Sequence, residues 1–202
     1  YVVLGSGGCS NDTATRTVTV TAAPVAGTLS GTQAICSNGT TTLSSTSAGG
    51  SWSSDDITKA TINASTGVVT AVAAGEALMT YTVTGTGGCL DATATRLVTV
   101  TDAVHAGSLS GTTGICVSGA TTFTTSGDEG GSWSSVNTAI ATVDASTGEI
   151  AGVGAGTTTI RYVVLGSGGC SNDTATRTVT VTAAPVAGTL SGTQAICSNG
   201  TT

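Results

Sequence analysis

Residues 132–164 read SWSSVNTAIATVDASTGEIAGVGAGTTTIRYVV, and the alternation at the end of this stretch decides the fold. Ile160, Tyr162 and Val164 occupy every second position, with Arg161 and Val163 between them. A period of two turns the apolar side chains to one face of a β-strand. Because helix signals are absent, the sequence predicts an all-β protein.

The same stretch occurs twice in related form. Residues 49–75 read GGSWSSDDITKATINASTGVVTAVAAG, and residues 130–156 read GGSWSSVNTAIATVDASTGEIAGVGAG. The repeating unit therefore has about 80 residues, as in arrays of small modules. Residues 1–41 are also identical to residues 162–202, so that two non-identical units alternate with a period of 161 residues. We expect the sequence to be part of a longer array.

Turn residues divide each unit into short strands. In the first whole unit we expect strands near 27–30, 33–36, 40–46, 50–54, 59–63, 67–72, 77–84 and 92–101. Seven or eight short strands in about 80 residues are typical of a β-sandwich with Greek-key connections. The expected domains are 1–24 (last strands of a preceding repeat), 25–103, 104–184 and 185–202 (first strands of a following repeat). Trp52, Trp133, Tyr81 and Tyr162 are the expected core aromatics.

The composition excludes two classes of partner. Only 8% of the residues are charged, the net charge is −6, and the five basic residues are scattered, so no basic patch exists for nucleic acid. The longest apolar run, VVTAVAAG at 68–75, is far shorter than the roughly 20 residues of a membrane-spanning helix. We expect neither nucleic-acid binding nor a membrane span.

Candidate catalytic and metal-binding residues are few. His105 is the only histidine, and valine holds its place in the other copies, so we interpret it as a linker residue. Asp55 with Asp56, and Asp128 with Glu129, lack the further regularly spaced oxygen ligands of a calcium site and are interpreted as solvated loop charge. We expect no catalytic residue, metal or cofactor.

The stretch 132–164 resembles the bacterial immunoglobulin-like group 2 domain. It has the elements W-S-S-x-N, A-T-V, T-G-x-[IV] and A-G-T-x-x-I in that order, and the first unit matches more loosely through DDITKATI and AGEALMTY. The resemblance implies tandem immunoglobulin-like β-sandwiches. It also implies the bacterial cell surface, where such modules occur in adhesins and invasins.

Six cysteines recur at fixed places in the repeat, namely Cys9, Cys36, Cys89, Cys116, Cys170 and Cys197. None is closely paired as zinc ligands are, so disulfides are favoured. In an immunoglobulin strand order Cys36 and Cys89 lie at opposite ends of one domain, so we predict an inter-domain bond between Cys36 and Cys170. The other four cysteines would then bond in neighbouring repeats. The alternative is an intradomain set, Cys36 with Cys89 and Cys116 with Cys170.

The predicted function is structural. We expect a tension-bearing, extracellular tandem array that forms a filament or an adhesin stalk, whose partners are neighbouring copies of the repeat. Thr13 and Thr174, each within the sequence DTA, are candidates for O-linked glycosylation. The alternatives are a glycan- or surface-binding adhesin module and an accessory domain of an enzyme.

Overall fold

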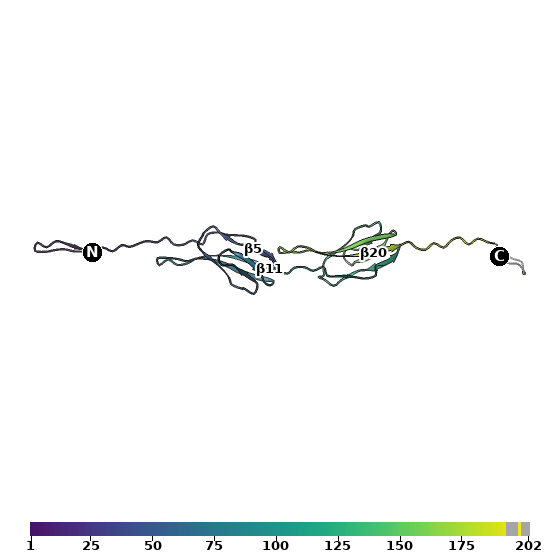
Figure 1. Cartoon of the computed structure of the whole chain (residues 1–202), viewed down its shortest axis with the longest axis horizontal. Helices are drawn as coiled ribbons and strands as arrows, with labels where there is room; N and C mark the ends of the chain where they lie inside the picture. Colours follow the sequence, from purple (N-terminus) through teal and green to yellow (C-terminus); the bar gives the residue numbers. More distant parts are fainter. Residues whose placement is uncertain (193–197, 199–202) are drawn as a thin grey trace. The chain divides into compact units, whose positions relative to one another are not determined.

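In a computed structural model, which describes residues 1–192 and 198, the chain is made of strands, and Figure 1 shows them in two bodies. Contacts divide it into two compact units. The first holds Tyr1–Asp102 with Gly168–Cys170, and the second holds Ala103–Ser167 with the chain from Ser171 onward. The predicted all-β class is confirmed. Over the described residues, no helix is long and apolar enough to cross a bilayer.

The first unit contains two main sheets and a short third pair. One sheet has the order β4-β11-β10-β7, the second has the order β5-β9-β8, and β3 pairs with β6. The strands are β3 (Leu29–Ser30), β4 (Ala34–Cys36), β5 (Thr40–Thr42), β6 (Ser44–Ser45), β7 (Ser51–Ser54), β8 (Ala60–Ile62), β9 (Val68–Ala71), β10 (Gly75–Val83) and β11 (Ala92–Thr101). All pairs are antiparallel except β4 with β11, which is parallel.

One predicted strand is divided in the structure. The expected strand at 40–46 is interrupted at Leu43, which is 1% exposed and whose backbone N–H donates to Gly67 O at 2.9 Å. The chain leaves the sheet of β9 at this residue and pairs next with β3 as β6. The division therefore lets one strand contribute to two sheets.

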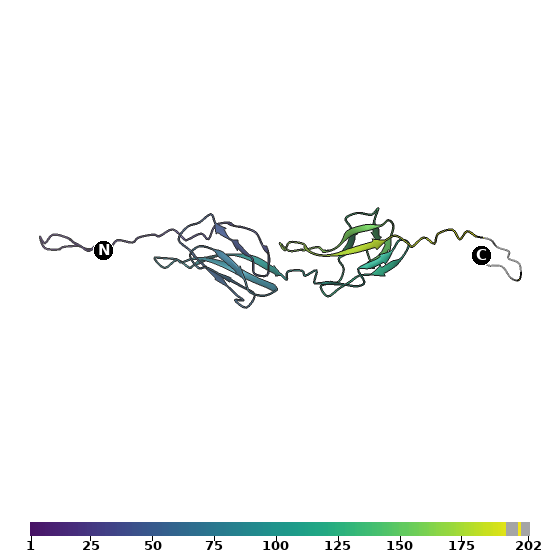
Figure 2. The ribbon, with the colours of Figure 1, turned by 45° about the vertical axis from the view of Figure 1, so that its right-hand side comes forward.

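The second unit repeats this topology (Figure 2). Its sheets are β13-β20-β19-β16 and β14-β18-β17, and β12 pairs with β15. The strands are β12 (Leu109–Ser110), β13 (Gly114–Cys116), β14 (Ala120–Thr122), β15 (Thr124–Thr125), β16 (Ser132–Ser135), β17 (Ala141–Val143), β18 (Glu149–Gly152), β19 (Gly156–Val164) and β20 (Asp173–Thr182). Here too the first strand of the large sheet, β13, runs parallel to the last, β20.

Each unit has its own core, formed by the inward positions of these alternating strands. Trp52 and Tyr81 pack with ring centroids 4.8 Å apart in the first unit, and Trp133 and Tyr162 are 4.7 Å apart in the second. All four side chains are buried. Tilted pairs at this separation add to the free energy gained by burial. The aromatic content is 3%, and each core has one such pair surrounded mainly by Val, Ile, Ala and Leu, with Met79 in the first unit and Phe123 in the second.

An arginine links the two layers in each unit. Arg96 of β11 donates through Nη1 to Leu29 O at 3.1 Å and through Nη2 to Gly31 O at 2.6 Å. Arg177 does the same in the second unit, to Leu109 O at 2.8 Å and Gly111 O at 3.2 Å. The guanidinium thereby satisfies carbonyl groups in the first strand and in the turn after it, groups that would otherwise lack partners beside the core.

The segment before the first unit contains strands β1 (Val2–Val3) and β2 (Asp12–Thr13), which pair antiparallel in the register of β19 with β20. Val18 and Val20 follow, 82% and 92% exposed, whereas the same sequence in β20 buries Val179 and Val181 to 0% and 2%. Identical residues are thus buried only where the other strands of a sandwich surround them. The domain boundaries given above remain predictions.

We predict that Tyr81→Phe lowers the stability of the first unit. The Tyr81 hydroxyl donates to Ser47 O at 2.9 Å and accepts from Gly50 N at 2.8 Å, so its removal leaves two backbone groups without their partner. The expected cost is about 1–3 kcal/mol, or about 4–8 °C in melting temperature per kcal/mol. Thermal unfolding measures it, with Tyr1→Phe as the control because Tyr1 is 89% exposed. Equal effects of the two substitutions would contradict the prediction.

We predict a difference in acid sensitivity at one equivalent turn. Asp144 Oδ1 accepts bonds from Thr147 N (2.8 Å), Ser146 N (2.9 Å) and the Thr147 hydroxyl (3.0 Å), and these donors hold its pKa below the ordinary value of 3.8. A carboxyl whose folded pKa is lowered contributes stability above its unfolded pKa and loses it as the pH falls through the folded pKa. In the first unit the uncharged Asn63 fills this place.

Asp144→Asn should therefore reduce the loss of stability of the second unit between neutral pH and a pH below 3.8. The reciprocal change, Asn63→Asp, should introduce such a loss in the first unit. Thermal unfolding measured as a function of pH checks both substitutions. The attribution to this turn is wrong if neither variant changes the pH dependence.

Candidate functional site

The parallel pair of β4 and β11 fixes the position of Cys36. The register joins Thr99 to Ala34, Val100 to Ile35 and Thr101 to Cys36. Backbone bonds continue the pairing at both ends, from Thr99 N to Gln33 O at 2.7 Å and from Ser37 N to Thr101 O at 2.8 Å. Cys36 therefore lies beside the residue at which the last strand of the first unit ends.

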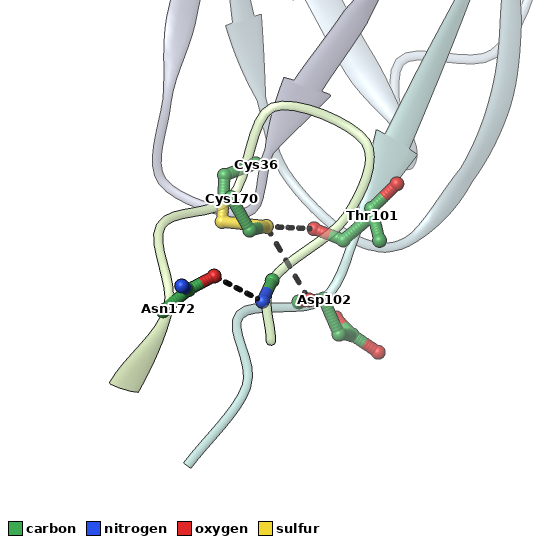
Figure 3. The surroundings of a disulfide bond; sticks show 6 residues. Cys36, Thr101, Asp102, Cys170 and Asn172 are labelled. Carbon is green, nitrogen blue, oxygen red and sulfur yellow. Dashed lines mark hydrogen bonds between the residues drawn. A yellow bond between two sulfur atoms is a disulfide. The ribbon is translucent and has the colours of Figure 1, made fainter. Parts of the chain in front are cut away.

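The structure contains a disulfide between Cys36 and Cys170, with Cα atoms 4.7 Å apart and a sequence separation of 134 (Figure 3). Cys170 lies in the loop that joins β19 to β20, and Gly168–Cys170, the tip of this loop, is grouped with the first unit. The sulfur of Cys170 lies 3.4 Å from both Thr101 O and Asp102 O. Because a disulfide sulfur has no hydrogen to donate, these are close sulfur–oxygen contacts.

Two glycines allow the loop tip to come this close. A Cβ at Gly168 would overlap Thr101 Oγ1, and one at Gly169 would lie 2.9 Å from Ala34 O. Their φ angles are +59° and +89°, in the region that glycine adopts at least cost. The base of the loop is closed by Gly166 N, which donates to Asn172 Oδ1 at 2.9 Å. The two glycines of the sequence GGC therefore allow the loop tip to place Cys170 beside the end of β11.

The equivalent loop of the first unit makes similar contacts. Cys89 Sγ lies 3.6 Å from Thr21 O, and a Cβ at Gly87 would overlap Thr21 Oγ1. Thr21 occupies the place in its repeat that Thr182, the last residue of β20, has in the second unit. Cys89 therefore lies beside the residue of another copy that corresponds to the end of the last strand, as Cys170 lies beside Thr101.

Three of the remaining cysteines, Cys9, Cys89 and Cys116, are free thiols in this structure. Cys9 and Cys116 are exposed, Cys89 is half-buried, and Cys197 lies outside the described residues. The alternative pairs, Cys36 with Cys89 and Cys116 with Cys170, are not formed.

The carboxylates serve local turns. Asp55 Oδ1 accepts from Leu78 N at 2.7 Å, and the Thr58 hydroxyl and backbone N–H, which bond to Asp56, lower the pKa of Asp56. Asp128 Oδ2 accepts from His105 N at 2.8 Å. Within the described part of the chain, no group of three or more histidine, cysteine or acidic residues could hold a metal ion.

The glycosylation candidates Thr13 and Thr174 are both exposed, in β2 and β20. Beside Thr174, Asp173 accepts bonds from Ala106 N and Thr174 N, and these lower the pKa of Asp173. Both threonines remain candidates.

Sequence reasoning missed two features of the structure. It gave no role to the glycines before the cysteine, although the diglycine precedes the cysteine in all three copies, at 7–9, 87–89 and 168–170. It also did not single out Arg96 and Arg177, whose recurrence on the last strand was the available signal.

The topology and the core define a protein built from immunoglobulin-like β-sandwich units. The family model for the immunoglobulin-like domain of intimin matches residues 122–163, all within the second unit. The prediction of a bacterial immunoglobulin-like domain is confirmed, and the family matched is that of intimin.

A comparison with curated proteins gives no match. Among solved structures, a C-terminal 282-residue fragment of intimin, determined in complex with the intimin-binding domain of its translocated receptor Tir, is 21% identical with a TM-score of 0.46. The alignment covers 76% of this chain and 62% of that fragment, so the chain spans less than two thirds of it. Murine CEACAM1b is 12% identical with a TM-score of 0.43, over 77% of this chain and all of that one.

We predict that Gly168→Ala disfavours the disulfide. The added methyl group would meet Thr101 Oγ1 at a φ of +59°, whereas the equivalent Gly7, at +65°, has no atom within 4 Å of its Cβ position. Strain of about 1.4 kcal/mol would lower the equilibrium constant for forming the disulfide in a thiol redox buffer about tenfold. Peptide mapping of the non-reduced protein measures the Cys36–Cys170 pair, with Gly7→Ala as the control. If Gly168→Ala left the equilibrium constant for forming the disulfide unchanged, this account of the loop would be wrong.

Proposed function

We propose that the protein is a structural, tension-bearing part of a bacterial surface filament or adhesin stalk. The Cys36–Cys170 bond is the observation that carries this proposal, because it joins the end of the strand pair in one unit to a loop whose flanking strands belong to the other unit. The match to an intimin immunoglobulin-like domain supports an adhesin-type role at the bacterial surface. We infer no enzymatic activity.

The spacing of the cysteines extends the proposal along the array. Cys9 repeats Cys170 and Cys197 repeats Cys36, each after 161 residues, while Cys89 and Cys116 hold the corresponding places in the alternate unit. The contacts of Cys89 with Thr21 resemble those of Cys170 with Thr101. Each repeat would therefore give one cysteine to the preceding repeat and one to the following repeat, with neighbouring copies of the repeat as its partners.

Such bonds would limit how far the array can extend. The bond encloses 134 residues, and from Cys170 the covalent path continues to Cys197 over 27 residues. These 27 residues reach at most about 90–97 Å when fully stretched. Unfolding of a unit would add little length to the array. The 27-residue path between successive disulfides would become taut first and carry the tension.

The parallel pair of β4 and β11 suits the same role. Since the two strands run in the same direction, the start of β4 and the end of β11 lie at opposite ends of the pair. If the disulfide were reduced, tension between these ends would act along the strands and load all their hydrogen bonds together. An extracellular, oxidising location agrees with the disulfide, and exposed Thr13 and Thr174 remain candidate glycosylation sites there.

We predict that the disulfide removes most of the chain from mechanical extension. When the 202-residue protein is pulled from its ends, the residues between Cys36 and Cys170 should contribute no contour length. Cys36→Ser should add about 480 Å, at roughly 3.6 Å for each enclosed residue. Single-molecule force spectroscopy without reductant measures this, and Cys116→Ser, which removes an exposed thiol, should behave as wild type. Equal contour lengths for wild type and Cys36→Ser would overturn the proposal.

A further inference from the structure

The second unit contains a cavity of about 650 Å³ that the structural role does not use. Its walls come from the loop at 124–132 and the turn at 145–147, with Phe123, Trp133 and Tyr162 beside them. The volume lies within the usual range for small-molecule sites, about 300–1,000 Å³. All of these residues belong to one unit.

Trp133 supplies a hydrogen-bond donor at this cavity. The residue is only 6% exposed, and its indole Nε1 does not belong to the buried atoms that lack a hydrogen-bond partner in the described part of the chain, which are Arg96 Nε and Arg177 Nε. Gly148, with a φ of +73°, leaves the space beside the indole open, because a Cβ there would lie 3.1 Å from Nε1 and 2.6 Å from Phe123 O. A ligand oxygen that accepts a hydrogen bond from this N–H would take the place of water as its partner.

Glu129 adds a carboxylate to the same cavity. Its neighbour Asp128 is held by the linker, since Asp128 Oδ2 accepts from His105 N at 2.8 Å and Asp128 N donates to His105 O at 2.7 Å. These two bonds fix the backbone immediately before Glu129. The exposed Glu129 side chain takes part in no hydrogen bond or ion pair within the described residues, so its carboxylate is free to accept bonds from a ligand.

The acidic residues are particular to this unit. The segment that leads to the core tryptophan differs between the units. Residues 43–52 of the first unit read LSSTSAGGSW, and residues 123–133 of the second read FTTSGDEGGSW. The second loop is one residue longer, and Asp128 and Glu129 stand where the first has only Ala48. The two units therefore share the tryptophan and differ in the carboxylate.

We propose that this cavity binds a neutral saccharide. The free carboxylate can accept bonds from two hydroxyl groups, the indole N–H can donate to a third, and Ser132 and Ser146 offer hydroxyls that can do either. The exposed Ala145 provides apolar contact for the C–H groups of a sugar ring. Glu129 and the net charge of −6 disfavour an anionic ligand. This inference is independent of the tension-bearing role.

The two tryptophans allow a test within one molecule. In an ¹⁵N–¹H NMR spectrum each indole gives one signal, which Trp52→Phe and Trp133→Phe assign. Cellobiose, lactose and N,N′-diacetylchitobiose serve as neutral probes, glucuronic acid as an anionic probe and choline as a cationic one. We expect at least one neutral disaccharide to shift the Trp133 signal saturably while the Trp52 signal stays in place.

Glu129→Gln should weaken that binding about tenfold, as expected for the loss of a charged hydrogen-bond acceptor. Glu76→Gln, at an exposed site of the first unit, should leave it unchanged. The remaining backbone signals show whether each variant is folded. The proposal is overturned if no neutral probe shifts Trp133, if both indoles shift alike, if Glu129→Gln binds as wild type, or if only choline binds.

Discussion

The parallel pairing of the first and last strands of the large sheet is the constraint on which the rest depends. In both units three residues of a short strand, β4 or β13, lie in register beside the last residues of β11 or β20. This pairing brings a cysteine to the point where the chain leaves the sandwich. Without it, Cys36 would not lie beside Thr101, and the loop tip that carries Cys170 would have no defined surface to meet.

The two units use the same framework for different surfaces. Tyrosine bonds to the loop before the tryptophan strand, and arginine bonds to the first strand, in both. Exposed and loop positions differ, such as Asn63 against Asp144 and the longer acidic loop at Glu129. Core side chains differ as well, since the buried Leu43 and Met79 correspond to Phe123 and Ile160. Side chains can therefore change between alternating repeats while the strand topology is preserved.

Much of the fold could be predicted from the sequence because alternation and turn residues are local signals. The expected strands at 33–36, 50–54 and 92–101 fall within one residue of β4, β7 and β11. The division at Leu43 could not be predicted, since it depends on which sheet each half of the strand joins. The recurring GGC is visible in the sequence, but the surface that its tip meets is not, because a close approach between distant segments depends on the tertiary structure.

The Cys36–Cys170 bond also affects how the molecule withstands damage. With this bond in place, residues 36–170 form a closed covalent ring. A protease that hydrolyses one peptide bond anywhere in that ring opens it but leaves both ends of the chain in a single covalent piece. A second cut in the same ring releases only the segment between the two cuts, so the two ends of the chain separate only when a backbone cut is combined with reduction of the disulfide.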